Sequence, residues 1–229
     1  MRRMVMILAL VAACGDDPMM MDPGPDAAMI TPDAPGNPTA AQLLGALTTC
    51  NVVGGKYAHN GGGTPTVDIC GLPGAVFWKA DLDVDCDGKI TPQCNLMTDP
   101  YFMNQTAATD SMGDPLDAAA LPFVVVPGVS TRWSYRNAGL RMGSVAVVIY
   151  KDRVEYGVLG DVGPTASIGE ASYRMAQVLG INPDPRIGGA SDEVAYIAFT
   201  GTAAEVDVME DHAMAVTIGV AHARALLGL

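Results

Sequence analysis

The sequence predicts a mainly β (α+β) fold, built as a small β-barrel with helical inserts. Three observations predict it. Short apolar or alternating runs, typical of strands, recur between residues 75 and 199. Few stretches space their apolar residues as a helix does. The 229 residues are 49% hydrophobic, which is enough for one substantial core. Many short strands with few helices favour a sheet that closes on itself.

Five runs are the expected strands. The run AVFWKADLDVDCDGKI (75–90) begins with apolar and polar residues in alternation, so it predicts a strand with one apolar face and one acidic face. FVVV (123–126) and VAYIAF (194–199) are continuously apolar and predict buried strands. SVAVVIY (144–150) and VEYGVLG (154–160) flank the turn KDR, which predicts a hairpin.

Helices are expected in three places. AQLLGAL (41–47) predicts a short helix, and AMAVTIGVAHARALL (213–227) predicts the last one. Between them, a helix is expected from about residue 168 to 179, with Gly180 at its C-cap position. The glycine-rich stretch 51–74 is expected to be mostly loop.

The N-terminal segment is expected to direct export. MRRMVMILALVAA (1–13) reads as a signal peptide, and the residues around the cut resemble the lipobox of bacterial lipoproteins. That resemblance implies lipidation of Cys14 and an anchor in the bacterial cell envelope, with Gly15 favouring the outer membrane. The alternative is an ordinary signal peptide and a secreted protein. Residues 14–40, rich in proline and aspartate, are expected to be a disordered tether, leaving 41–229 as the folded domain.

The cysteines predict disulfides. With Cys14 lipidated, four thiols remain in an exported protein, so two bridges are expected. Their pairing is left open among three connectivities. Zinc is not expected, because no CxxC pair occurs and the histidines lie far from the cysteines. The candidates are Cys50, Cys70, Cys86 and Cys94.

The charge balance narrows the class of partner. The chain has 25 acidic against 13 basic side chains, and from residue 41 onward the ratio is 20 to 11. This balance repels nucleic acid and anionic membranes and suits a cationic partner. Membrane contact is therefore expected only through the lipid. No P-loop, GxSxG, HExxH or dinucleotide fingerprint is present, and no cofactor is expected.

Two carboxylates in GDVGPTASIGEAS (160–172) are the strongest candidates for chemistry. Asp161 follows the hairpin and Glu170 comes nine residues later. A structural role remains open for each. Ser167 and Glu170 fit an S-x-x-E capping box at a helix start, and Asp161 before Gly-Pro fits an Asx-turn.

Four motifs carry a family resemblance. FWKADLDVDCDG (77–88), LPFVVVPG (121–128), the segment from VAVVIY to MAQVLGI (145–181) and DEVAYIAFTG (192–201) occur in the order typical of glycoside hydrolase family 75, the endo-chitosanases. The resemblance covers Val76 to Gly201. The GD turn and the helix ending in Leu-Gly also resemble a double-psi β-barrel.

The resemblance implies endo-hydrolysis of β-1,4 bonds in chitosan with inversion at the anomeric carbon. It assigns Asp161 as the base that activates water and Glu170 as the general acid. The segment between these two acids is shorter here than in fungal members. Two rivals stay open: a hydrolase or lyase on another glycan such as peptidoglycan, and a non-catalytic glycan-binding lipoprotein.

A cationic polysaccharide would be bound by acids. We expect Asp81 and Asp83 to pair with its ammonium groups, with Lys79 and Tyr156 as further contacts; the alternatives are a solvated strand face and a core aromatic. Asp85 and Asp87 flank Cys86, where they can have a structural role in a turn instead of binding substrate. The DxDxDG run at 83–88 imitates an EF-hand loop, but Cys94 stands where that loop needs glutamate, so no metal is expected. The domain is expected to act as a monomer.

Overall fold

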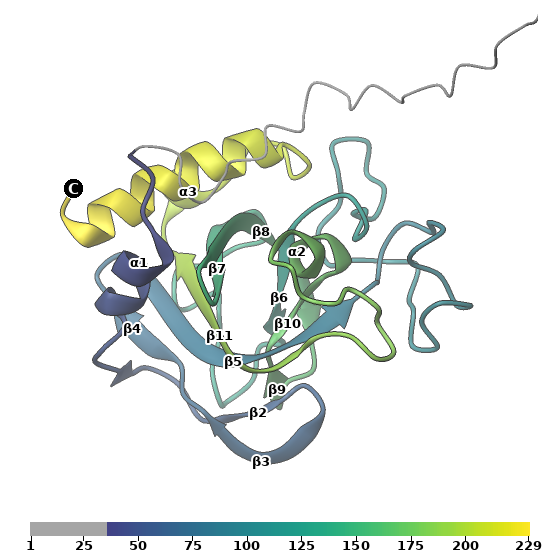
Figure 1. Ribbon diagram of the computed structural model, residues 1–229, viewed down its shortest axis with the longest axis horizontal. Coiled ribbons are helices and arrows are strands. Elements are labelled where there is room, and N and C mark those ends of the chain that lie inside the picture. Colours follow the sequence, from purple (N-terminus) through teal and green to yellow (C-terminus); the bar gives the residue numbers. More distant parts are fainter. Residues whose placement is uncertain (1–35) are drawn as a thin grey trace, which may run out of the picture.

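The computed structural model describes residues 36–229 (Figure 1). The expected signal peptide, the lipidation site at Cys14 and most of the tether lie outside the described residues. Within the described part, the chain forms a closed barrel of six strands, with short strands and helices added around it. The prediction of a mainly β fold with helical inserts is confirmed, whereas the double-psi likeness stays a prediction.

The elements follow one another in a single pass along the chain. Their bounds are α1 Ala40–Ala46, β1 Asn51–Val52, β2 Tyr57–His59, β3 Gly62–Val67, β4 Cys70–Leu72, β5 Ala75–Asp85, β6 Phe123–Pro127, β7 Val145–Tyr150, β8 Arg153–Gly163, β9 Ser167–Ile168, β10 Glu170–Ser172, α2 Tyr173–Val178, β11 Ala190–Phe199, a short 3₁₀ turn Thr202–Ala204, and α3 His212–Leu227.

The barrel closes in the order β5-β10-β6-β8-β7-β11, because β11 pairs with both β7 and β5. Two of its pairings are parallel, β5 with β10 and β6 with β8, and the others are antiparallel. The expected hairpin of β7 and β8 is present, with Tyr150 opposite Arg153 across the turn. Strand alternation then divides the side chains into an inner and an outer set.

The inner set fills the barrel. Side chains from all six strands meet in one core cluster, and Trp78 stacks on Tyr196 with ring centroids 5.2 Å apart. The outer set of β7, β8 and β11 forms a second core against α1 and α3. Figure 1 shows α3 running along one side of the barrel, with α1 beside it and the β2–β3 hairpin at the opposite side. The outward-facing positions of β5, β10, β6 and β8 that α1 and α3 do not cover are available for a site.

Two expectations for the fold are wrong in detail. Residues 51–74 form four short strands, in which β4 pairs antiparallel with β5. The helix expected from residue 168 begins only at Tyr173, because Ser167–Ile168 and Glu170–Ser172 are strands that pair with β2 and β5. Its N-cap is Ser172, whose hydroxyl accepts the N–H of Met175.

The expectation of two disulfides is confirmed. Cys50 pairs with Cys70 and Cys86 pairs with Cys94. The first ties the end of the α1 segment to β4, and the second closes a short loop directly after β5. Among the described helices, none combines the length and the apolar character that a membrane crossing requires.

Candidate active site

The two candidate catalytic acids lie in one row across the barrel. Glu170 on β10 is opposite Val125 on β6, and Val125 is in turn opposite Asp161 on β8. On the other side, Glu170 is opposite Asp83 on β5. Residues opposite each other on neighbouring strands point to the same face. All four side chains line a single cleft of about 840 Å³ on the outside of the barrel.

A β-bulge decides that Asp161 faces the cleft. Val124 of β6 is opposite Leu159, but the next residue, Val125, is opposite Asp161, so Gly160 is the extra residue. Leu159 points into the barrel, and regular alternation would send Asp161 the same way. The bulge re-aims the carboxylate outward. A Cβ on Gly160 would lie 2.8 Å from Phe123, so no larger residue fits there without displacement.

Another glycine turns Glu170 toward the cleft. Gly169 has φ +109°, a conformation that L side chains rarely adopt, and a Cβ there would collide with Asp81. Its carbonyl accepts the N–H of Asp83, which fixes the start of β10 against β5. Because Glu170 belongs to this strand, the capping-box alternative is wrong. Its carboxylate reaches over β6, and Oε2 lies 3.2 Å from the position of a Cβ on Gly163.

Backbone N–H groups hold the carboxylate of Asp161. Its Oδ1 accepts the N–H of Ala107 and that of Val162, each at 2.7 Å. Burial raises the pKa of Asp161, and these two hydrogen bonds oppose the rise because they stabilise the ionised form. Oδ2 has no hydrogen bond within the described part of the chain, and the residue lines the cleft.

Glu170 sits in a different environment. Burial raises its pKa to about 8, and the nearby charges of Asp83, Asp87, Asp161 and Asp99 contribute in the same direction. No hydrogen-bond donor in the described residues is directed at its carboxylate to offset the rise. At neutral pH the side chain therefore holds its proton, as a general acid must.

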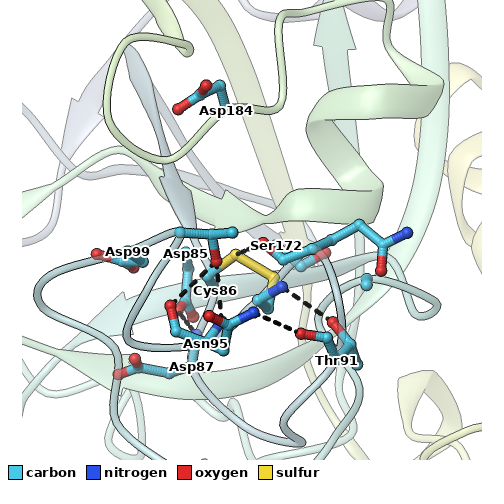
Figure 2. Close-up of a disulfide and its surroundings, with 12 residues drawn as sticks. Asp85, Cys86, Asp87, Thr91, Asn95, Asp99, Ser172 and Asp184 are labelled. Carbon is cyan, nitrogen blue, oxygen red and sulfur yellow. Dashed lines mark hydrogen bonds between the residues drawn. A yellow bond between two sulfur atoms is a disulfide. The ribbon is translucent and has the colours of Figure 1, made fainter.

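The end of β5 and the loop that follows it bring further acids to the cleft. Asp85 is only 6% exposed, and its Oδ1 accepts the N–H of Asp87 at 2.6 Å. Asp87 in turn accepts the N–H of Met103 through its Oδ1, also at 2.6 Å. Asp99 also lines the cleft and accepts the N–H of Tyr101. Figure 2 shows Asp85, Asp87 and Asp99 around the Cys86–Cys94 disulfide, with Asp184 on a separate loop.

The cleft is charged only by acids. Within the described residues, its lining contains six carboxylates and no lysine, arginine or histidine. Three of them, Asp85, Asp87 and Asp161, each place one oxygen within 4.8 Å of the others, a spacing that a cation can bridge. Burial raises the pKa of Asp85 well above its usual range, and the charges of Glu170 and Asp161 add to the rise. The six are Asp83, Asp85, Asp87, Asp99, Asp161 and Glu170.

The expected substrate contacts divide into two groups. Asp83 lines the cleft, where its Oδ2 accepts a hydrogen bond from Asn60 at 3.1 Å. Asp81 lies outside it, and its Oδ1 is 3.0 Å from Nδ1 of His59. Lys79 lines a different hollow beside His59. Tyr156 is 3% exposed and packs in the core beneath α3, so a direct sugar contact through Tyr156 does not fit its position.

A family model described as fungal chitosanase of glycosyl hydrolase group 75 matches residues 82–218, more than half of the chain. The chain belongs to glycosyl hydrolase group 75. Endo-chitosanase B of Aspergillus oryzae is 32% identical over 171 residues, which cover 66% of this chain and 71% of the relative. An endo-chitosanase of Aspergillus fumigatus is 29% identical over 167 residues, covering 66% and 70%. The recognition of the family from the four sequence motifs is confirmed.

All six acids of the cleft fall inside the segment that matches the group 75 model, whereas Lys79 and Asp81 precede it. Asp85, Asp87 and Asp99 were not predicted from the sequence as cleft residues. The acidic run 83–88 did contain a signal for the first two. Asp99 had none, because only the fold of the long segment between β5 and β6 brings it to the cleft.

Proposed function

We propose that this group 75 chain is an endo-acting chitosanase that hydrolyses β-1,4 bonds of chitosan with inversion. The observation that carries the proposal is the row of Asp161 and Glu170 in a cleft charged only by acids. A polymer of glucosamine is cationic, so such a cleft suits it. The relatives named endo-chitosanase support the same substrate.

The two acids have the environments that their roles require. Glu170, protonated at neutral pH, gives its proton to the glycosidic oxygen as the bond from that oxygen to C1 breaks. Asp161, whose ionised form receives two backbone N–H bonds, takes a proton from water through Oδ2. The oxygen of that water forms the new bond to C1. Because their surroundings differ, one carboxyl group can act as the acid and the other as the base.

Inversion is what the resemblance to the family implies, and the separation of the two carboxyl groups is the quantity that decides it. Asp161 and Glu170 are two strands apart, which separates their backbones by about 10 Å. Inverting glycosidases hold their carboxyl groups roughly 6.5–9.5 Å apart to admit a water, whereas retaining enzymes need about 5 Å. Every catalytic group in this proposal comes from one chain, so a monomer suffices.

The test is the viscosity of a chitosan solution incubated with the wild-type chain, Asp161→Asn or Glu170→Gln. Each variant should lose at least about a hundredfold in rate while keeping its circular dichroism spectrum. Asp207→Asn, at an exposed acid away from the cleft, should match the wild type. Full activity in either cleft variant would remove that residue from the mechanism. Cleavage of peptidoglycan alone, or chitosan binding without shortening, would favour one of the two rival functions.

We also propose that the chain is exported and anchored to the cell envelope through lipidated Cys14. The two disulfides support export, because such bonds persist in oxidising compartments. In a bacterial host, Cys14→Ser should release the protein from the membrane fraction. Retention of this variant in the membrane would contradict the anchor without affecting the proposed activity.

A further inference from the structure

The carboxyl group of Glu170 is not held in place by hydrogen bonds. Asp161 is oriented by two backbone N–H groups, but no donor among the described residues is directed at the carboxyl oxygens of Glu170. The residue before it, Gly169, has φ +109°, and glycine restrains the backbone less than any other residue. The position of Glu170 therefore depends on the pairing of β10 and on the group that packs against the turn at Gly169.

Asp81 of β5 is the group that packs there. A Cβ on Gly169 would collide with Oδ1 of Asp81 and would lie 3.0 Å from its carbonyl oxygen, so both oxygens lie directly against the turn. The carbonyl oxygen also accepts a hydrogen bond from the hydroxyl of Tyr196, a fully buried residue, at 2.8 Å. The backbone of Asp81 is thus fixed, and the orientation of its carboxylate depends on what contacts Oδ1.

His59 makes that contact. Its Nδ1 lies 3.0 Å from Oδ1 of Asp81 and 3.2 Å from the backbone nitrogen of the same residue. Without a hydrogen, Nδ1 accepts this N–H and leaves the buried Oδ1 without a donor among the described residues. With a hydrogen, Nδ1 donates to Oδ1. Because a buried acceptor without a donor is costly, the donating form is favoured.

The strand of His59 is tied to the same turn. His59 is opposite Ile168 on β9, the residue directly before Gly169. Asn60, which follows His59, donates to Oδ2 of Asp83 at 3.1 Å, so β2 is joined to β5 as well as to β9. The fold itself therefore holds the imidazole against β5, and no substrate is needed for this contact.

Resting on the proposed function, we infer that Asp81 and His59 are positioning residues for Glu170. His59 orients the carboxylate of Asp81, this carboxylate restrains the turn at Gly169, and the turn keeps the acid in line with the glycosidic oxygen. Asp81 and His59 both lie outside the cleft lining, so they act through Glu170 and not on the sugar. This role replaces the contact with substrate ammonium groups that was expected for Asp81. Misplacing a reacting group by about 1 Å can cost a hundredfold in rate, so such a restraint matters.

The test measures kcat and KM for chitosan cleavage from initial rates of reducing-end formation. Asp81→Ala and His59→Ala should each lower kcat at least about tenfold and change KM less than about twofold, because the acid is misaligned in an intact cleft. Asp81→Asn, which keeps an acceptor oxygen, and His59→Gln, which keeps a donor, should each retain most of the wild-type kcat. Asp68→Ala is the matched control: Asp68 lines the same hollow as His59 but pairs with exposed Lys56, and this variant should match the wild type.

A pH profile separates positioning from a merely structural effect. The alkaline limb of kcat/KM reports the general acid of the free enzyme, and burial raises the pKa of Glu170 to about 8. When the turn is released in Asp81→Ala, the carboxyl group gains solvent and its pKa falls, so the limb should move to lower pH by at least about 0.5. Asp81→Asn removes the same charge and should leave the limb in place.

The outcomes separate the two claims. No cleavage by the wild-type chain would overturn the proposed function and this inference with it. An unchanged kcat in both alanine variants would overturn the inference alone, as would a change confined to KM, which would show that Asp81 contacts the substrate. Asp81→Asn as slow as Asp81→Ala, or an alkaline limb that stays in place in Asp81→Ala, would also overturn it. If thermal melting shows Asp81→Ala to be unfolded, His59→Ala and His59→Gln carry the same comparisons, since the His59 side chain is 40% exposed.

Discussion

Glu170 and Asp161 show how the barrel places two carboxyl groups in different electrostatic environments. Both are largely withdrawn from solvent, and burial raises the pKa of each. Asp161 receives two backbone N–H bonds that oppose the rise, whereas Glu170 meets mainly the charges of other acids. One of these bonds comes from Val162 of β8 itself, and the other comes from the segment around Ala107, which lies against β8.

The raised pKa of Glu170 predicts a pH-dependent stability. Its pKa rises from the ordinary value of 4.5 to about 8 on folding, so between these values the folded state binds more protons than the unfolded state. The free energy of unfolding should therefore fall as pH rises through this range. Urea unfolding should show Glu170→Gln equal to the wild type near pH 4.5 and more stable at pH 9, by roughly 1–3 kcal/mol. Parallel curves for the two proteins would contradict this account.

At the scale of the element, strand β8 supplies side chains both to the interior of the barrel and to the cleft. Leu159 fills the barrel, and two residues later Asp161 points into the cleft. Only the extra residue Gly160 makes this possible, since residues two apart on a regular strand point the same way. The chemistry of the site thus depends on a local irregularity in a strand that is otherwise in register with β6 and β7.

Filling the bulge should therefore damage the site. In Gly160→Ala, the new Cβ would lie 2.8 Å from Phe123 and 2.9 Å from Leu116. We expect at least tenfold slower chitosan cleavage and a loss of about 1–3 kcal/mol in stability. Gly45→Ala is the matched control, because a Cβ there meets nothing within 4 Å in helix α1 and should be neutral or stabilising. Full activity in Gly160→Ala would show that the bulge is not required.

These elements also mark the limit of the sequence analysis. Five of the six barrel strands were predicted because they carry clear apolar patterns, and the hairpin and last helix followed for the same reason. The short strands β1–β4 were missed, because polar, glycine-rich residues such as those of β3 lack any apolar pattern. Glu170 was assigned to a helix start, since S-x-x-E does not reveal that β5 and β6 capture residues 170–172.

The site was predictable to a similar extent. Motifs led to Asp161 and Glu170, but not to the row that brings them together, which depends on pairings between strands far apart in the sequence. The sequence could not distinguish Asp81 from Asp85 for the same reason. Both project from one face of β5, and only tertiary structure shows that Asp81 meets His59 while Asp85 meets the cleft.

At the scale of the molecule, charge is concentrated where the substrate is expected. The chain has 25 acidic against 13 basic side chains, and the cleft lining, within the described residues, has only acids. A field of one sign attracts an oppositely charged polymer over a distance that salt shortens, from a Debye length of about 10 Å at 0.1 M to about 3 Å at 1 M.

Ionic strength should therefore weaken the enzyme before it affects the fold. Raising sodium chloride from 50 mM to 500 mM should lower kcat/KM on chitosan severalfold, mainly through KM, because long-range attraction is screened. The melting temperature should change little over the same range, which serves as the control. A kcat/KM that is independent of salt would contradict the electrostatic role of the cleft.

The Cys86–Cys94 disulfide affects when the cleft can reach its final structure. It closes the loop that starts at Asp85 and carries Asp87, so two acids of the cleft are secured by a crosslink that needs an oxidising environment. In a reducing compartment the chain would have its barrel strands but not this disulfide. Recombinant production in a reducing host should therefore yield a protein in which this loop of the cleft is not secured by the disulfide.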